Sequence, residues 1–131
     1  MIVVLDTSAA VEVLLHRPEA DRLASGIAAA EWVLAPALYT SELCNVFWKY
    51  HQFQSLSRET CLRAIAQGLT LPDTLSDDRE LQREAFTMAC LCRQPVYDML
   101  YLVLARRHSA CLLTLDQTLK ALAEQHDVAV G

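Results

Sequence analysis

Short, wholly apolar runs that lead directly into segments of helical periodicity are the feature that most constrains the fold of this chain. Residues 2–5 form such a run, and Asp6, Thr7 and Ser8 separate it from the apolar-rich segment 9–15. A strand that is apolar on both faces is typical of a buried parallel sheet. Carboxylate and hydroxyl side chains are preferred where helices begin. The pattern therefore predicts a buried parallel strand, a capped turn and a helix.

The same unit recurs along the chain, with residues 32–35 as a second strand and Pro36 opening a helix that continues through Trp48. The alternation of strands and helices predicts an α/β fold, a single-domain α/β/α sandwich with a central parallel sheet. The other expected elements are a helix over 57–68 that ends at Gly68, a short edge strand within 69–75, a helix from the acidic stretch 76–80 to about Cys92, a helix that begins near Asp98, a strand over 110–115 ending at Asp116, a helix over 117–125 and a final strand over 128–130.

Bulk properties indicate an ordinary globular protein. The chain has 131 residues, of which 53% are hydrophobic and 21% charged, so we expect one domain over residues 1–131. Its five cysteines lack the spacing of a disulfide scaffold, the apolar N-terminus lacks the basic flank of a signal peptide, and no apolar run approaches the ~20 residues that span a bilayer. We therefore expect a cytoplasmic protein with reduced thiols and no membrane segment.

The net charge of −5 argues against a protein that coats nucleic acid through many phosphate contacts. A nuclease remains compatible with this charge, because divalent cations held by carboxylates supply positive charge at the reacting phosphate.

Two acids, Asp6 and Asp116, directly follow apolar strands, and ligands of open α/β sheets bind at the carboxyl ends of strands. Glu42 lies in a helix that follows a strand, and Asp98 lies near the start of another helix, so both can project to the same edge. Each acid also has a simpler interpretation. Asp98 and Asp116 could cap helices, and Glu42 could be a solvated helix position.

Four converging carboxylates need a cation. Each like-charged pair about 4 Å apart costs about 4 kcal/mol at an effective dielectric near 20. An all-oxygen donor set suits Mg²⁺ or Mn²⁺ better than Zn²⁺, which prefers histidine and cysteine. Convergence of these acids would therefore predict a divalent-metal site.

Four short motifs occur in order along the chain. They are Leu5-Asp6-Thr7-Ser8, Ser41-Glu42-Leu43 with Asn45, Tyr97-Asp98 followed by Tyr101 and Ala105-Arg106, and Leu113-Thr114-Leu115-Asp116. Each motif alone is weak, whereas their joint occurrence is specific. In this combination the sequence resembles the PIN-domain family, and its compact length is similar to that of VapC-type toxins within the family.

The resemblance implies a Mg²⁺- or Mn²⁺-dependent endoribonuclease that acts on RNA and is usually paired with a cognate antitoxin that blocks the site. It implies that Asp6, Glu42, Asp98 and Asp116 are the catalytic and metal-binding acids. Thr7 or Ser8, and Thr114, would be supporting polar residues. The glycine that the family typically has after the Asp98 helix is absent, because Arg107-His108-Ser109 stands there.

Two other functions stay open. A phosphatase or phosphotransfer domain also places an Asp after its first strand, but the second Asp of haloacid-dehalogenase-like enzymes is missing from Asp6-Thr7-Ser8. A PIN-like scaffold that binds RNA or protein without catalysis is the other alternative. The aromatic group Phe47, Trp48, Tyr50 and Phe53 could be part of the core and its boundary, and the alternative is a homodimer or antitoxin interface.

Overall fold

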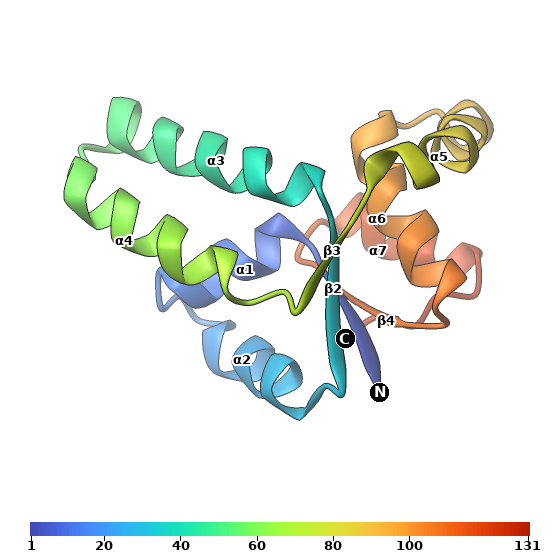
Figure 1. The fold of residues 1–131 in the computed structure, drawn as a ribbon, viewed down its shortest axis with the longest axis horizontal. Coiled ribbons are helices and arrows are strands. Elements are labelled where there is room, and N and C mark those ends of the chain that lie inside the picture. Colours follow the sequence, from blue (N-terminus) through green and yellow to red (C-terminus); the bar gives the residue numbers. More distant parts are fainter.

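The computed structural model describes all residues from Met1 to Gly131 and contains four strands and seven helices. Figure 1 shows the strands in the middle of the molecule, with α1 to α4 on one side and α5 to α7 on the other. The predicted α/β/α sandwich is thereby confirmed. In chain order the elements are β1 (Ile2–Leu5), α1 (Thr7–Leu14), α2 (Ala20–Ala29), β2 (Trp32–Pro36), α3 (Leu38–Gln54), α4 (Arg58–Leu69), β3 (Thr74–Ser76), α5 (Asp78–Cys92), α6 (Val96–Arg107), β4 (Cys111–Leu113) and α7 (Gln117–Gln125).

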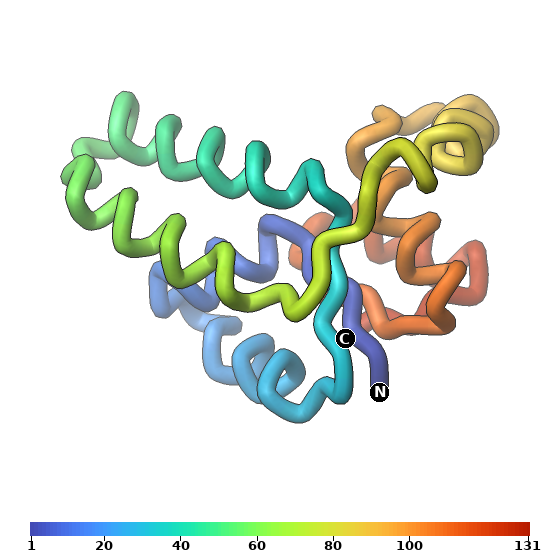
Figure 2. The backbone as a smooth tube through the Cα atoms, in the orientation of Figure 1, coloured from blue at the N-terminus to red at the C-terminus, as the bar shows by residue number.

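The four strands form one parallel sheet in the order β3-β2-β1-β4. Strand β1 is central, and its residue Val4 is in register with Leu34 on one side and Leu112 on the other. Val3, Val4 and Leu5 are completely buried, as their apolar character predicts. Because all strands run the same way, the residues that follow them gather at one edge, as the chain trace in Figure 2 lets the reader follow.

Helix α6 is the most buried helix of the sandwich, with every residue from Met99 to Ala105 buried. It packs against β1, β2 and β4, so its first turn lies beside the carboxyl edge of the sheet. Its C-terminal loop contains Ser109, whose φ of 49° is a left-handed conformation that glycine adopts at less cost. The loop therefore keeps the backbone shape that favours glycine. None of the helices combines the length and apolarity that a membrane crossing needs.

Helices α3 and α4 pack together as an arm beside the sheet (Figure 1). The prediction that Gly68 ends α4 is wrong, because the helix continues to Leu69 and Gly68 has no positive φ. A Cβ at Gly68 would lie 2.6 Å from Leu43 Cδ2 and 2.9 Å from Leu14 Cδ1. This glycine thus permits close approach of α4 to its neighbouring helices.

The predicted bounds differ from the structure at several other places. Helix α2 was not anticipated, and Pro36 ends β2 instead of opening α3. The expected strand over 128–130 is reduced to a single parallel bridge between Leu112 and Val130. After α7 the chain turns at Asp127, whose φ is 59°. The residues that follow pair with the sheet only at Val130.

Strand β4 ends at Leu113, earlier than predicted, because hydroxyl groups replace its ladder partners. The amide of Leu115 donates to Ser8 Oγ at 3.0 Å, and the amide of Asp116 donates to Thr114 Oγ1 at 3.0 Å. Asp116 consequently stands after a short turn and does not follow the strand directly. This turn leads from β4 to α7, and its hydrogen bond to Ser8 joins it to the start of α1.

Candidate active site

Asp6 lies at the end of the central strand and is buried. The Asp6 carbonyl accepts the first backbone hydrogen bonds of α1, but its side chain does not cap that helix. Instead, Asp6 Oδ2 accepts hydrogen bonds from Ser8 Oγ at 2.7 Å and from Thr114 Oγ1 at 2.6 Å. Burial raises the pKa of Asp6, although the bonds from Thr114 and Ser8 oppose this rise. Both of these bonds go to Oδ2, and a backbone hydrogen bond from Thr7 to the carboxylate also opposes the rise in pKa.

Glu42 lies in the second turn of α3 and faces Asp6. Its Oε1 accepts hydrogen bonds from Tyr101 Oη at 2.6 Å and from Thr7 Oγ1 at 3.2 Å. Burial raises the pKa of Glu42, the bond from Tyr101 lowers it, and the charges of Asp6 and Asp98 add to the rise. Glu42 is therefore a half-buried member of the cluster and not a solvated helix position.

Asp98 lies in the first turn of α6, where no side chain caps the helix amides. The capping interpretation of Asp98 is therefore wrong. The pKa of Asp98 is raised by partial burial and then by the charges of Asp116 and Asp6. Asp98 thus lies near Asp116 and Asp6, and it shares Asp6 as a neighbour with Glu42.

Asp116 is exposed and is the N-cap of α7, where Oδ1 accepts a hydrogen bond from the Leu119 amide at 3.0 Å. The capping interpretation of this residue is correct. Its negative charge nevertheless contributes to the raised pKa values of Asp6 and Asp98, so it lies near both. Asp116 both starts a helix and belongs to the acidic cluster.

No lysine or arginine compensates this cluster. The four ion pairs of the chain involve Glu31, Glu19, Asp77 and Glu84, all of them outside it. The donor set consists of carboxylate oxygens, which suits Mg²⁺ or Mn²⁺. With the side chains as they stand, no three acidic, histidine or cysteine residues are arranged to hold a metal ion. To hold one, at least three of these carboxylates would have to draw closer together.

The family model of the PIN domain matches residues 3–125. The chain belongs to the PIN-domain family. PIN domains are generally metal-dependent nucleases, which agrees with the uncompensated carboxylates at the edge of the sheet. The fold is also similar to the crystal structure of PAE2754 from Pyrobaculum aerophilum, with a TM-score of 0.75, 22% identity, and coverage of 92% of this chain and 86% of that chain. A search of curated proteins found no match.

Tyr101 is the residue of this PIN domain that sequence reasoning did not assign. It is 1% exposed and donates to Glu42, and a further hydrogen bond of 3.0 Å joins its hydroxyl to Thr7 Oγ1. The signal was present in the sequence, because Tyr101 is the only polar side chain within the apolar run 99–105. A buried phenol usually has a hydrogen-bond partner.

Proposed function

We propose that this PIN domain is a divalent-metal-dependent endoribonuclease that hydrolyses phosphodiester bonds of RNA. The observation that carries the proposal is the group of four carboxylates, contributed by the end of β1, α3, α6 and the start of α7, with no cationic side chain among them. Such a group is electrostatically costly without a cation. The residues that would hold Mg²⁺ or Mn²⁺ are Asp6, Glu42, Asp98 and Asp116.

When bound, the metal supplies positive charge that polarises the phosphodiester and lowers the pKa of attacking water. Ser8 and Thr114 orient Asp6 by donating to its Oδ2, while Tyr101 and Thr7 orient Glu42 by donating to its Oε1. Hydrogen bonds of this kind fix the direction of ligand oxygens and are a recurrent part of metal sites.

The decisive assay is cleavage of structured and single-stranded RNAs with Mg²⁺, with Mn²⁺ and with chelator, using Asp6→Asn as the inactive control. We expect internal cuts that require a divalent metal and are absent in the variant. Cleavage that persists in chelator, or in Asp6→Asn at the wild-type rate, would refute the proposal. Hydrolysis of a small phosphomonoester should not occur, which separates this activity from that of a phosphatase.

One observation favours the alternative of a non-catalytic PIN-like scaffold that binds RNA or protein. The carboxylates are not arranged to hold a metal without movement. A scaffold would bind its partner equally well with metal and with chelator. The nuclease proposal predicts instead that the protein binds Mn²⁺ and that Asp6→Asn weakens Mn²⁺ binding.

We further propose that the enzyme is the toxin of a toxin-antitoxin pair and that it forms a homodimer. Phe47 is completely buried, whereas Trp48 and Phe53 are 51% and 71% exposed and contact each other edge to face at 5.9 Å. Exposed aromatic pairs favour a protein partner. The substitution Trp48→Ala should lower the solution mass to that of a monomer, and an unchanged dimer mass would count against this interface.

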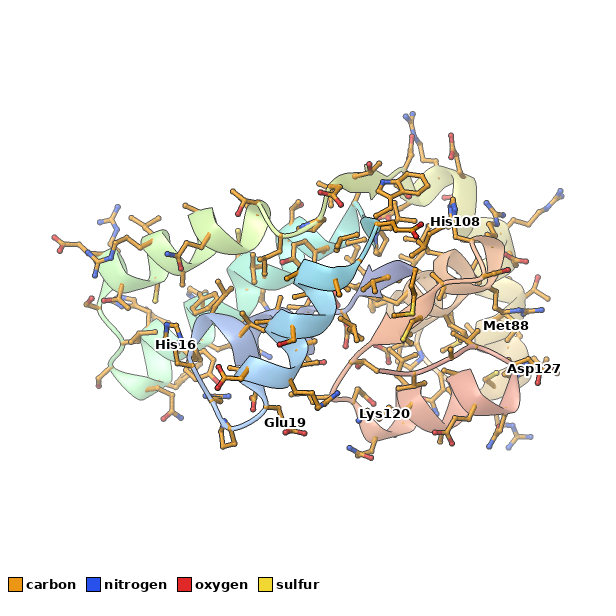
Figure 3. The ribbon with its side chains drawn as sticks, turned by 90° about the horizontal axis from the view of Figure 1, so that it is seen from below. His16, Glu19, Met88, His108, Lys120 and Asp127 are labelled. Atoms are coloured by element: carbon orange, nitrogen blue, oxygen red, sulfur yellow. The ribbon has the colours of Figure 1, made fainter.

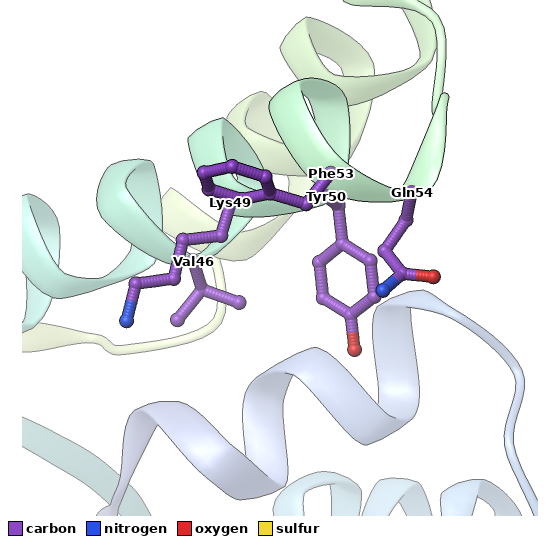
Figure 4. Close-up of a pocket in the computed structure, with 5 residues that line it drawn as sticks. All are labelled: Val46, Lys49, Tyr50, Phe53 and Gln54. Atoms are coloured by element: carbon purple, nitrogen blue, oxygen red, sulfur yellow. The ribbon is translucent and has the colours of Figure 1, made fainter.

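A pocket of about 430 Å³ lies beside this aromatic pair, on the side of α3 that faces α1 (Figure 4). Lys49, Tyr50 and Phe53 line it, and the Arg17 guanidinium donates to Tyr50 Oη and stacks 5.1 Å from its ring centre. The two cations suit an acidic segment of a cognate antitoxin. A small adjacent reading frame whose product binds this protein and inhibits its RNA cleavage would support the toxin role.

A further inference from the structure

A small pocket borders the carboxylates on the side where α3 meets α6. Its volume is about 240 Å³, below the roughly 300–1,000 Å³ typical of a whole small-molecule site. Leu38, Ser41, Glu42 and Asn45 line it from α3, and Tyr97 lines it from α6. Leu38 is three and four positions before Ser41 and Glu42, and Asn45 is four and three positions after them, so the four residues lie along one side of the helix. Glu42 thus belongs both to this pocket and to the acidic cluster.

Tyr97 gives the pocket an exposed aromatic surface. Its side chain is 62% exposed and stacks on no other aromatic ring of the chain. It precedes Asp98 directly, in the first turn of α6. A solvent-facing ring that contributes so little to the core is available to stack on a flat ligand.

The opposite wall is polar. Ser41 and Asn45 are both exposed, and the Asn45 amide offers a donor and an acceptor on one planar group. Proteins that bind single-stranded RNA commonly stack unpaired bases on aromatic side chains and bind the base edges through such groups. The pocket joins these two kinds of contact beside a carboxylate.

We propose that this pocket, defined by Leu38, Ser41, Glu42, Asn45 and Tyr97, is a subsite for one unpaired nucleobase of the RNA substrate. The base stacks on Tyr97 and its edge faces Asn45, which leaves the adjoining phosphodiester beside Glu42 and Asp98. This inference rests on the proposed nuclease function and adds a base-binding subsite to it.

The test compares Tyr97→Phe, which keeps the ring, with Tyr97→Leu, which removes it. Phe86→Leu is the matched control, because Phe86 is 63% exposed on α5 and lies outside the pocket. Tyr97→Leu should raise KM for a single-stranded oligoribonucleotide about tenfold or more with little change in kcat. Tyr97→Phe should raise KM much less than Tyr97→Leu, because it keeps the stacking ring, and Phe86→Leu should behave as the wild type.

A second measurement uses oligoribonucleotides that lack one base at successive positions, with affinity measured in the Asp6→Asn background to prevent cleavage. At one position, removal of the base should weaken binding to the protein that has Tyr97. The same removal should not weaken binding to the protein that also carries Tyr97→Leu. Such non-additivity indicates a direct contact between the base and Tyr97. Equal losses in both proteins at every position would overturn the subsite while leaving the nuclease proposal intact. If the protein neither binds nor cuts any RNA, both proposals are wrong.

Discussion

Asp6 and Glu42 are each held by two hydroxyl groups, whereas Asp98 and Asp116 are not. Ser8 and Thr114 donate to one oxygen of Asp6, and Tyr101 and Thr7 donate to one oxygen of Glu42. In the other half of the cluster, Asp98 lies at an uncapped helix start, and Asp116 is bound only to the amide of its own helix.

The difference indicates a division between a fixed pair and an adjustable pair. A metal site whose donors do not yet converge needs some carboxylates that keep their orientation and others that can move. The hydroxyl groups provide the first condition at Asp6 and Glu42. Asp98, which no side chain holds, and Asp116, which is exposed, provide the second.

The largest expected effect comes from the fixed pair. Asp6→Asn should lower RNA cleavage by about 100- to 1,000-fold, because metal-based stabilisation of the transition state is worth several kcal/mol and 1.4 kcal/mol is about tenfold. Asp127→Asn is the matched control, since Asp127 lies beyond the far end of α7 (Figure 3) and its substitution removes the same charge. Initial rates under saturating Mn²⁺ are the measurement, and comparable losses in both variants would contradict a specific role for Asp6.

The hydroxyl groups that hold the fixed pair should have the next largest effect. Tyr101→Phe should lower activity by about 10- to 100-fold, the usual range for residues that orient metal ligands. Tyr39→Phe is the control, because Tyr39 is also completely buried and donates at 2.7 Å to the Gly68 carbonyl, outside the site. Both variants should lose similar stability. A similar loss of activity in both would show that Tyr101 acts only through folding.

For the adjustable pair, Asp98→Asn should abolish RNA cleavage and yet stabilise the metal-free protein by up to about 1 kcal/mol, because it removes one repelled carboxylate whose repulsion is partly screened by solvent. The pKa of Asp98 is raised in the folded state, so folding disfavours its charged form. The advantage of the variant should therefore be absent below the ordinary carboxyl pKa of about 4 and grow as pH rises through the raised pKa. Urea unfolding in chelator across this range measures it, and a variant less stable at neutral pH would contradict the account.

The smallest effect concerns the capping role of Asp116. Asp116→Ala should cost about 1 kcal/mol of stability, whereas Asp116→Asn should cost only a few tenths, because asparagine is an equally good N-cap. Both should reduce cleavage, since both remove the charge. Thermal unfolding combined with rate measurements separates the two roles, and wild-type cleavage by Asp116→Asn would exclude Asp116 from the site.

The fold could be predicted from the sequence where apolarity alone decides. Apart from Tyr101, the side chains are apolar in residues 2–5, 32–35 and 99–105. The sequence therefore predicted the parallel sheet and α6 correctly. Helix α2 was missed because it buries only Ala20 and Leu23, which is too weak a pattern to stand out. The end of β4 was missed because the Leu115 amide donates to the hydroxyl of Ser8, a contact between segments 107 positions apart, and the Asp116 amide donates to the nearby hydroxyl of Thr114.

In the candidate site, too, local sequence predicts some residues, and contacts between distant segments determine the others. The position of Asp6 after β1 could be predicted from local sequence. Glu42 could not, because its orientation depends on Tyr101, 59 residues away. Local sequence also could not decide whether Asp98 caps its helix, and the structure shows an uncapped helix start.

Direct titration of the protein with Mn²⁺ tests the central claim, that the four carboxylates act as one divalent-metal site. Electron paramagnetic resonance of free Mn²⁺ gives the bound fraction without any RNA. The account predicts saturable binding to the wild type and to Asp127→Asn, with binding strongly weakened in Asp6→Asn. Equal binding to all three proteins, or no binding to the wild type, would contradict it.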